Sequence, residues 1–441
     1  MFTVKQAAHE LGVSAPRIYQ LIESGALKAE KFGNVWAIEE SSIQARKKSP
    51  KKAGRPLKQL KTDLRNYTLM NREYAILDFT YDATSNKIVS VGAIKDESRA
   101  PLGLLSQQKA KSLLRTFKYW WSHRSIPASR PGIEAKLKQL GYAKTSDIAI
   151  DALGFSLSDQ YWVCPENSGF KWRDLNFFDN SFECCAAHET NLLEQVGLKN
   201  PDNTSDGNLP KTWVCKGNKR LLLKGAGPLG QEVYNEVLAT KLFSKFLQPS
   251  EFVSYRKREF GKQLVCECSC FLKDFEEFVP AYYIKEAFAK PNHINWFQHY
   301  INCCVKLGVS NVQQFLEKMI LLDFILLNHD RHFRNFGLIR NVHTLKWRLA
   351  PLFDSGSCLF CNVSTHDLPH AYELFSTKPF YEQPKRQLRL VSDMSWVKID
   401  LLKGFVDEVS SELAQDKTLA MRLPYIADAI NKQVSVVEVL K

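Results

Sequence analysis

Apolar positions recur with helical spacing at the start of the chain and predict two short helices. Thr3 is a suitable N-cap for the first helix, whose buried face should contain Ala7, Ala8 and Leu11. After a turn at Gly12, Ser14 is placed to cap a second helix over residues 15–23. This second helix turns Ile18, Leu21 and Ile22 inward and leaves Arg17, Tyr19 and Gln20 facing outward.

The segment that follows has the pattern of a β-hairpin. Residues 28–38 carry Gly33-Asn34, a two-residue turn signal, at their middle. Two helices joined by a tight turn and followed by a hairpin form a winged helix-turn-helix, and this segment resembles the excisionase and MerR-type DNA-binding domains. Such a domain sets its second helix in the major groove and its wing against the backbone or the minor groove. A small helical module that docks on protein is the alternative.

A basic segment comes next. Nine basic residues and one acidic residue, Asp63, lie between Arg46 and Arg65. Within this segment, Gly54-Arg55-Pro56 resembles the core of an AT-hook, which places its arginine in a narrow minor groove. The run, together with a net charge of +13, favours salt-dependent binding to DNA phosphates. The residues that we expect to contact DNA are Ser14, Arg17, Tyr19, Gln20, Lys31, Asn34 and Arg55.

Later in the chain, an apolar run leads into a polar loop. Residues 319–327 are almost wholly apolar and should anchor the loop 328–337 in a core. Residues 336–340 and 346–353 then predict two strands around a turn. Asp354 directly follows the second strand, so we expect it to face the loop.

This loop contains the residue types that phosphoryl transfer requires. Asp330 is followed five positions later by Asn335, which is the spacing of the protein-kinase catalytic loop. Phosphoryl transfer needs a carboxylate to orient the attacking hydroxyl and oxygen ligands to hold Mg²⁺ on the phosphates. We therefore expect Asp330 to act as the base and Asn335 and Asp354 to bind the metal. An ordinary polar surface turn is the alternative.

Upstream segments provide for the nucleotide. Residues 204–211 form a polar, glycine-containing loop whose N–H groups can cover phosphates. A short apolar strand over residues 220–225 contains Lys224, and a helix over residues 230–246 contains Glu236. A strand lysine paired with a helix glutamate points an ammonium group at the ATP phosphates. The order of these motifs along the chain carries the prediction, because each motif alone is common.

Together these motifs resemble the HipA-like serine/threonine kinases, including the CtkA-type branch, over roughly residues 200–400. The resemblance implies ATP and Mg²⁺ as cofactors, a hinge strand at residues 266–271 that reads adenine, and autophosphorylation at Thr204 or Ser205. It implies that the catalytic residues are Asp330, Lys224 and Asn335. The ATP-binding residues that it implies are Gly207, Asn208, Lys211, Lys224, Glu236, Ser269, Phe271 and His332.

The length of the chain favours several domains. Its 441 residues exceed the roughly 250–300 that one core holds. We expect an α+β protein with a two-lobed, diverged kinase-like fold and a small winged helix-turn-helix domain. The predicted divisions are a helix-turn-helix domain at 1–45, a basic linker at 46–66, a family-specific extension at 67–200, a kinase N-lobe at 201–275 and a helical C-lobe at 276–441. Within the C-lobe, residues 358–381 are expected to face the substrate.

These features predict an ATP- and Mg²⁺-dependent serine/threonine protein kinase joined to a DNA-binding domain, with a toxin–antitoxin or transcription-linked role implied by the resemblance. The expected partners are a protein substrate, DNA through residues 1–65, and a second copy or an antitoxin-like protein. No apolar run approaches the roughly 20 residues of a membrane span and no signal peptide is evident, so we expect a cytoplasmic protein without a membrane partner. The alternatives are a DNA-binding regulator with a nucleotide-sensing pseudokinase, and a kinase for a lipid or small molecule.

Overall fold

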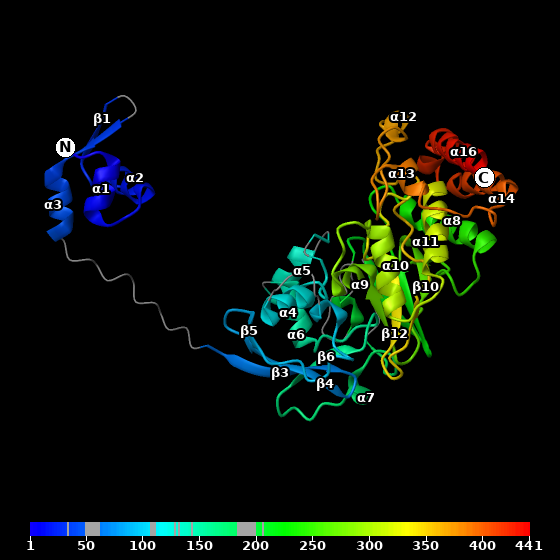
Figure 1. Cartoon of the computed structure of the whole chain (residues 1–441), viewed down its shortest axis with the longest axis horizontal. Helices are drawn as coiled ribbons and strands as arrows, with labels where there is room; N and C mark the ends of the chain where they lie inside the picture. The colour runs from blue at the N-terminus through cyan, green and yellow to red at the C-terminus, as the bar shows by residue number, and fades with distance from the viewer. Residues whose placement is uncertain are drawn as a thin grey trace. The chain divides into compact units, whose positions relative to one another are not determined.

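The structure, a computed structural model, describes residues 1–32, 35–48, 62–105, 112–127, 129–130, 133–142, 144–182, 200–204 and 207–441. The chain divides into two compact units, Met1–Thr62 and Asp63–Lys441 (Figure 1). Strands and helices alternate irregularly along the larger unit, and its last strand is followed by helices. The α+β class and the two-lobed arrangement predicted from the sequence are confirmed.

The N-terminal unit is a small helical domain with a hairpin. Its elements are α1 Val4–Leu11, α2 Ala15–Glu23, β1 Ala29–Phe32, β2 Val35–Ile38 and α3 Glu40–Lys48. The Thr3 hydroxyl and the Gln6 side chain form a capping box at the start of α1. Its core is formed by Ala7, Ile18, Leu21, Leu27, Ile38 and Ile43. The two predicted helices and the hairpin are therefore present, whereas α3 was not predicted.

Residues 63–182 form a sheet with helices beside it. The strands are β3 Leu64–Asn71, β4 Tyr74–Asp82, β5 Lys87–Val91 and β6 Tyr161–Pro165, in the order β5-β4-β3-β6. The helical segments are η1 Leu102–Leu104, α4 Leu113–Ser122, α5 Ile133–Leu140, α6 Thr145–Asp151 and α7 Trp172–Leu175. Phe117, Trp120 and Trp121 of α4 pack on the sheet together with Ile150 of α6. This sheet and its helices form a small lobe with its own core.

The next segments form two further antiparallel sheets. The first consists of β7 Lys211–Lys216, β8 Lys219–Lys224, β9 Arg256–Phe260 and β10 Gln263–Ser269, in the order β7-β8-β10-β9. The 3-10 turn η3 Pro201–Thr204 precedes it, and α8 Gln231–Phe246 connects β8 to β9. The second sheet consists of β11 Glu276–Pro280, β12 Gly337–Asn341 and β13 Trp347–Leu349. The strands predicted on either side of the turn after the polar loop are thus present and paired.

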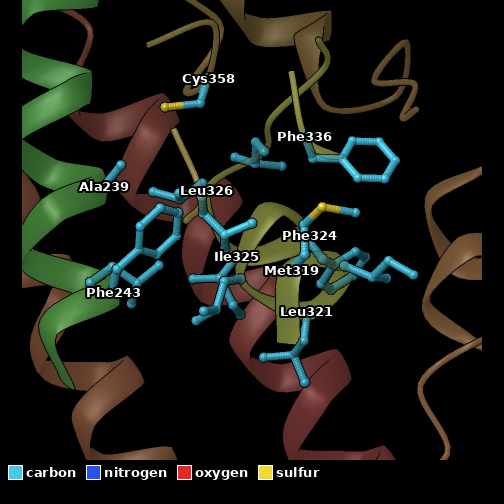
Figure 2. Packing of buried hydrophobic residues seen from close by; sticks show 14 of the residues in the cluster. Ala239, Phe243, Met319, Leu321, Phe324, Ile325, Leu326, Phe336 and Cys358 are labelled. Atoms are coloured by element: carbon cyan, nitrogen blue, oxygen red, sulfur yellow. The ribbon is translucent and has the colours of Figure 1, made fainter. Parts of the chain in front are cut away.

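The remaining elements are helices around one large core. They are α9 Ala281–Ala287, α10 Trp296–Lys306, α11 Val312–Ile325, α12 Leu368–Ala371, α13 Pro384–Leu388, α14 Ile399–Leu413, α15 Lys417–Ala420 and α16 Leu423–Leu440. The apolar run that precedes the polar loop is the second half of α11, at the centre of this core. Figure 2 shows its side chains between Phe243 of α8 and Phe336, which lies near the end of the polar loop. The loop is therefore anchored in the core, as predicted.

A buried polar network fastens the lobe of residues 63–182 to the rest of the larger unit. Glu277 of β11 is paired with Arg340 of β12 at 2.6 Å, and it accepts a hydrogen bond from Asn71 of β3 at 3.1 Å. Arg340 also donates to the hydroxyl of Tyr161 on β6. Because an unpaired charge is costly to bury, the Glu277–Arg340 pair and its hydrogen bonds fix how the lobes meet. None of the helices in the described ranges is long and apolar enough to traverse a bilayer.

Candidate active site

A cavity of about 630 Å³ lies within the larger unit, where the sheets meet the helical lobe. The polar loop lines it with Asp330, His332 and Asn335, and the segment after β13 lines it with Phe353 and Asp354. Seven further predicted residues line the cavity from the sheet of β7, β8 and β10 and the segments next to it, and they are Thr204, Gly207, Asn208, Lys211, Lys224, Ser269 and Phe271. Motifs that are more than a hundred residues apart in the chain therefore meet at one cavity.

Lys224 is the centre of a buried ion network at this cavity. Its ammonium group is 2.5 Å from Glu236 Oε1 of α8, and it also contacts the carboxylate of Asp354. Burial lowers the pKa of Lys224, but Asp354 and Glu236 outweigh burial and hold that pKa well above its usual value. Burial raises the pKa of Asp354, yet Lys224 and Lys211 bring it below its usual range. Lys224 and Asp354 are therefore both charged at neutral pH.

Glu236 acts through its neighbours and does not line the cavity. Its second carboxylate oxygen accepts a hydrogen bond from the backbone N–H of Ser355 at 3.1 Å. A Cβ at Gly356 would lie 3.2 Å from the carbonyl oxygen of Glu232, so a glycine lets this segment approach α8 closely. Asn235 adds hydrogen bonds of 2.8 Å to the carbonyls of Gly356 and Cys358. Helix α8 thus sets the position of Lys224 and of Asp354 at the same time.

The backbone of the polar loop is held by its own side chains. The side-chain nitrogen of Asn335 donates to the backbone carbonyl of Asp330 at 3.0 Å. The backbone N–H of Asp330 donates to the side-chain oxygen of Asn328 at 3.0 Å. The backbone N–H of His332 donates to the same Asp330 carbonyl at 2.7 Å. Since its nitrogen is used in this way, Asn335 presents its amide oxygen to other ligands. Asp330 keeps about a third of its side chain exposed toward the cavity.

Arg331, which the sequence did not single out, connects these segments from beneath. Its buried guanidinium forms a bidentate pair with Asp323 of α11 at 2.8 and 3.1 Å. It also donates to the carbonyls of Asn335 and Phe353 and to the hydroxyl of Ser355. Asp323 is the one acidic residue in an apolar run, and a buried carboxylate needs a partner, which was the available sequence signal.

Aromatic and thiol side chains form the apolar side of the cavity. Phe271, just past the end of β10, stacks on Phe353 with ring centroids 5.4 Å apart, and Phe278 packs edge-on against Phe353 at 5.2 Å. Burial raises the pKa of Cys268 to about 12 and that of Cys270 to about 11, so both thiols are neutral. A flat, apolar surface of this kind suits a purine ring. Ser269 lies at the end of β10 beside it.

The loop before β7 is held by the lobe of residues 63–182. Gly207 has a φ of +92°, which favours glycine, and its carbonyl accepts hydrogen bonds from Arg130 at 3.1 and 2.9 Å. Ser129 donates to the side chain of Asn208 at 2.7 Å. The hydroxyl of Thr204 is buried and donates to the carbonyls of Phe155 and Pro201. Thr204 therefore has to leave this position before it can accept a phosphoryl group, and Ser205 lies outside the described residues.

The residues expected to hold Mg²⁺ are oxygen donors at one cavity. Asp354 is ionised and lines the cavity together with Asn335, whose side-chain oxygen accepts no hydrogen bond from the described residues. Carboxylate and amide oxygens are the ligands that Mg²⁺ accepts when nucleotide phosphates complete its coordination. The donor set therefore suits the metal that the sequence predicted.

Five of the seven residues expected to contact DNA are described, and all five lie on the surface of the N-terminal unit. Arg17, Tyr19 and Gln20 are exposed on α2, and Arg17 donates to Gln20 at 2.9 Å. Ser14 occupies the N-cap position of α2, but among the described residues its hydroxyl makes no capping hydrogen bond. Lys31 is exposed on β1 and lies 5.8 Å from the Trp36 ring. Asn34 and Arg55 lie outside the described residues.

Comparison with known proteins gives similarities for both units. Residues 1–49 match the family described as Helix-turn-helix domain. A segment of 46 residues is 41% identical to the serine/threonine-protein kinase CtkA of Helicobacter pylori. This match covers 10% of the chain and 14% of that kinase.

Two solved structures are also similar to the chain. One is the Helicobacter pylori proinflammatory kinase CtkA, with a TM-score of 0.38 and 14% identity over 52% of this chain and 93% of that one. The other is the complex of HipA, HipB and operator DNA from a toxin–antitoxin system of Shewanella oneidensis. Its TM-score is 0.46, with 11% identity over 84% of this chain and 97% of that one.

The N-terminal match agrees with the helix-turn-helix domain predicted from the sequence. The N-terminal match ends one residue after α3, so it covers both helices, the hairpin and the additional helix. The chain thus carries an N-terminal helix-turn-helix domain and resembles the HipA-like kinases of the CtkA type.

Proposed function

We propose that the chain is an ATP- and Mg²⁺-dependent serine/threonine protein kinase of the HipA-like type, linked to a DNA-binding domain. The observation that carries this proposal is the convergence on one cavity of Lys224, Asp354, Asn335 and Asp330. Lys224 is positively charged beside an ionised Asp354, which is the state that phosphoryl transfer requires of these two groups.

The nucleotide is proposed to lie with its base against Phe271 and Phe353 and its phosphates near Lys224. The Lys224 ammonium would neutralise phosphate oxygens, because Glu236 fixes it at the cavity wall. Gly207 and Asn208 of the loop before β7, and Lys211 at the start of β7, would face the phosphates. Mg²⁺, held by Asp354 and Asn335, supplies charge neutralisation on the phosphate oxygens when it is bound.

Asp330 is proposed to act on the acceptor. A serine or threonine hydroxyl would donate a hydrogen bond to its carboxylate and give up its proton there as the new bond from oxygen to the γ-phosphorus forms. The bond from the γ-phosphorus to the bridging oxygen breaks, and ADP leaves with the electron pair. Arg331 would keep the loop and the Asp354 segment in register through this step, since it donates to both.

The helix-turn-helix domain is proposed to bring this activity to DNA. The exposed side chains of α2 would enter the major groove, and the basic residues from Arg46 to Arg65 would add phosphate contacts. Residues 1–65 would therefore hold the chain at an operator, as in a toxin–antitoxin or transcription-linked regulator. Residues 358–381 would meet the protein substrate, and a second copy or an antitoxin-like protein would regulate it.

The test is incubation of the purified chain with γ-labelled ATP and Mg²⁺, beside Asp330→Ala and the surface control Asp400→Ala. We expect label on serine or threonine in the wild type and the control, and none in Asp330→Ala or after chelation of Mg²⁺. Tight ATP binding without transfer would indicate a nucleotide-sensing pseudokinase instead. Transfer to lipid headgroups or small molecules, with none to protein, would indicate a lipid or small-molecule kinase.

A further inference from the structure

Lys378 reaches the proposed catalytic base from a distant part of the chain. Its ammonium nitrogen lies 2.8 Å from Oδ1 of Asp330, although 48 residues separate the two. No motif in the sequence assigned a role to this lysine. It belongs to the stretch of residues 358–381 that follows the Asp354 segment.

The turn that carries Lys378 is built and held from both sides. The buried hydroxyl of Thr377 donates to the carbonyl of Tyr381 at 3.0 Å, and the Thr377 N–H donates to the carbonyl of Glu382 at 2.8 Å. The buried amide of Gln387 on α13 donates to the Lys378 carbonyl at 2.6 Å. Its oxygen accepts the N–H groups of Phe380 and Tyr381 at 3.0 and 3.2 Å. The Lys378 backbone is therefore fixed by buried polar groups.

An aromatic cluster joins this turn to the polar loop. The Phe380 ring lies 5.6 Å from Phe333 and 6.4 Å from Phe336, which flank Asn335 in the loop that contains Asp330. Phe380 also packs edge-on against Phe297 of α10 at 5.2 Å. The turn at Lys378 and the polar loop thus pack against each other through aromatic rings. This packing fixes the distance between the backbones of Lys378 and Asp330.

We propose that Lys378 is a positioning residue for phosphoryl transfer, an inference that rests on the proposed kinase function. By binding Oδ1, it holds the Asp330 carboxylate in one rotamer and leaves Oδ2 for the hydroxyl of the acceptor. The acceptor proton passes to Oδ2 as the bond from oxygen to phosphorus forms and ADP leaves. The half-exposed ammonium group of Lys378 can stay paired with Oδ1 throughout the transfer, because the step requires no movement of the lysine.

The test compares the full-length wild type with Lys378→Ala, Lys378→Arg and Lys385→Ala, a matched change of an exposed lysine on α13. Turnover, KM for ATP, ATP affinity and Tm are measured for each. We expect Lys378→Ala to lower kcat on the order of 10- to 100-fold, the range for losing a hydrogen bond to a charged group. KM for ATP, ATP affinity and Tm should stay unchanged, Lys378→Arg should recover part of kcat, and Lys385→Ala should match the wild type.

The other outcomes overturn this inference in distinguishable ways. Unchanged turnover in Lys378→Ala removes the positioning role and leaves the kinase function standing. Increased turnover would show that the Lys378–Asp330 contact inhibits the transfer instead of supporting it. A fall in kcat accompanied by equal losses of ATP affinity or of Tm, without recovery in Lys378→Arg, would reduce the lysine to a structural role. No transfer by the wild type overturns both this inference and the proposed function.

Discussion

At the scale of single residues, Arg331 has the largest predicted effect on folding. It is fully buried, and Asp323 is its only ion-pair partner among the described residues. Removing the guanidinium in Arg331→Ala leaves that carboxylate buried without a counter-charge, which costs about 3–5 kcal/mol of the free energy of unfolding. Urea denaturation measures this loss. Arg331→Lys should recover part of it, whereas a loss below about 1 kcal/mol would contradict the assigned role.

A second residue-scale prediction concerns pH. Asp202 is buried beside the loop before β7, where burial raises the pKa of its carboxyl to about 7, although Thr212 and the Trp213 N–H oppose the shift. Between about pH 4 and 7 the folded chain therefore binds a proton that the unfolded chain has released. The free energy of unfolding should fall as pH rises through this window.

Asp202→Asn should remove that dependence, because the amide does not titrate. Between about pH 4 and pH 8 the free energy of unfolding should fall more in the wild type than in Asp202→Asn. This one group sets an upper bound of about 4 kcal/mol on the extra loss. Denaturation at a series of pH values checks it. Identical pH profiles for wild type and variant would show that Asp202 does not contribute.

At the scale of elements, the close approach of β11 and β12 gives the third prediction. A Cβ at Gly337 would lie 2.2 Å from the carbonyl oxygen of Val279, on the strand that β12 pairs with. Gly337→Ala therefore forces the two backbones apart directly after Phe336, with a cost of about 1–3 kcal/mol from overpacking. The shift would also displace Asn335, so ATP-dependent transfer should fall together with Tm. A variant with wild-type Tm and activity would contradict this account.

Much of the element pattern was accessible from the sequence because local signals and global fold agree. Helical spacing, capping residues and the Gly33-Asn34 turn marked α1, α2 and the hairpin, and apolar strands marked β7, β8, β12 and β13. Helix α3 was missed because its basic C-terminal end belongs to a run that also suits an unstructured linker. Its anchoring in the core depends on the single buried side chain of Ile43.

Only part of the candidate site could be predicted from the sequence, because some of its residues are brought there by the tertiary fold alone. Asp330, Asn335, Asp354 and Lys224 stand in motifs with fixed spacing, so the sequence names them. Arg130 and Lys378 reach the site through the tertiary fold, and no local sequence pattern sets them apart from the other lysines and arginines of the chain. The burial of the Thr204 hydroxyl is equally a tertiary property, since the carbonyl of Phe155 that it meets is 49 residues away.

At the scale of the whole molecule, the two units have separate cores, and we predict that their activities separate as well. Arg17→Ala on α2 should lower DNA affinity by about 1–3 kcal/mol if Arg17 reads a base, and leave phosphoryl transfer unchanged. DNA binding is measured with fragments selected from a random-sequence pool at two salt concentrations. Asp330→Ala, the reciprocal control, should bind DNA as the wild type does. Loss of both activities in either variant would contradict the separation.

The central claim is that the cavity at Asp330 and Lys224 transfers a phosphoryl group from ATP to a serine or threonine hydroxyl. Its most direct test is the paired measurement of ATP affinity and single-turnover transfer rate in the wild type and in Asp330→Asn. We predict equal affinities, and a transfer rate that falls by about 10²- to 10⁴-fold in the variant, as expected for loss of a general base. Equal transfer rates, or transfer by neither protein, would contradict the claim.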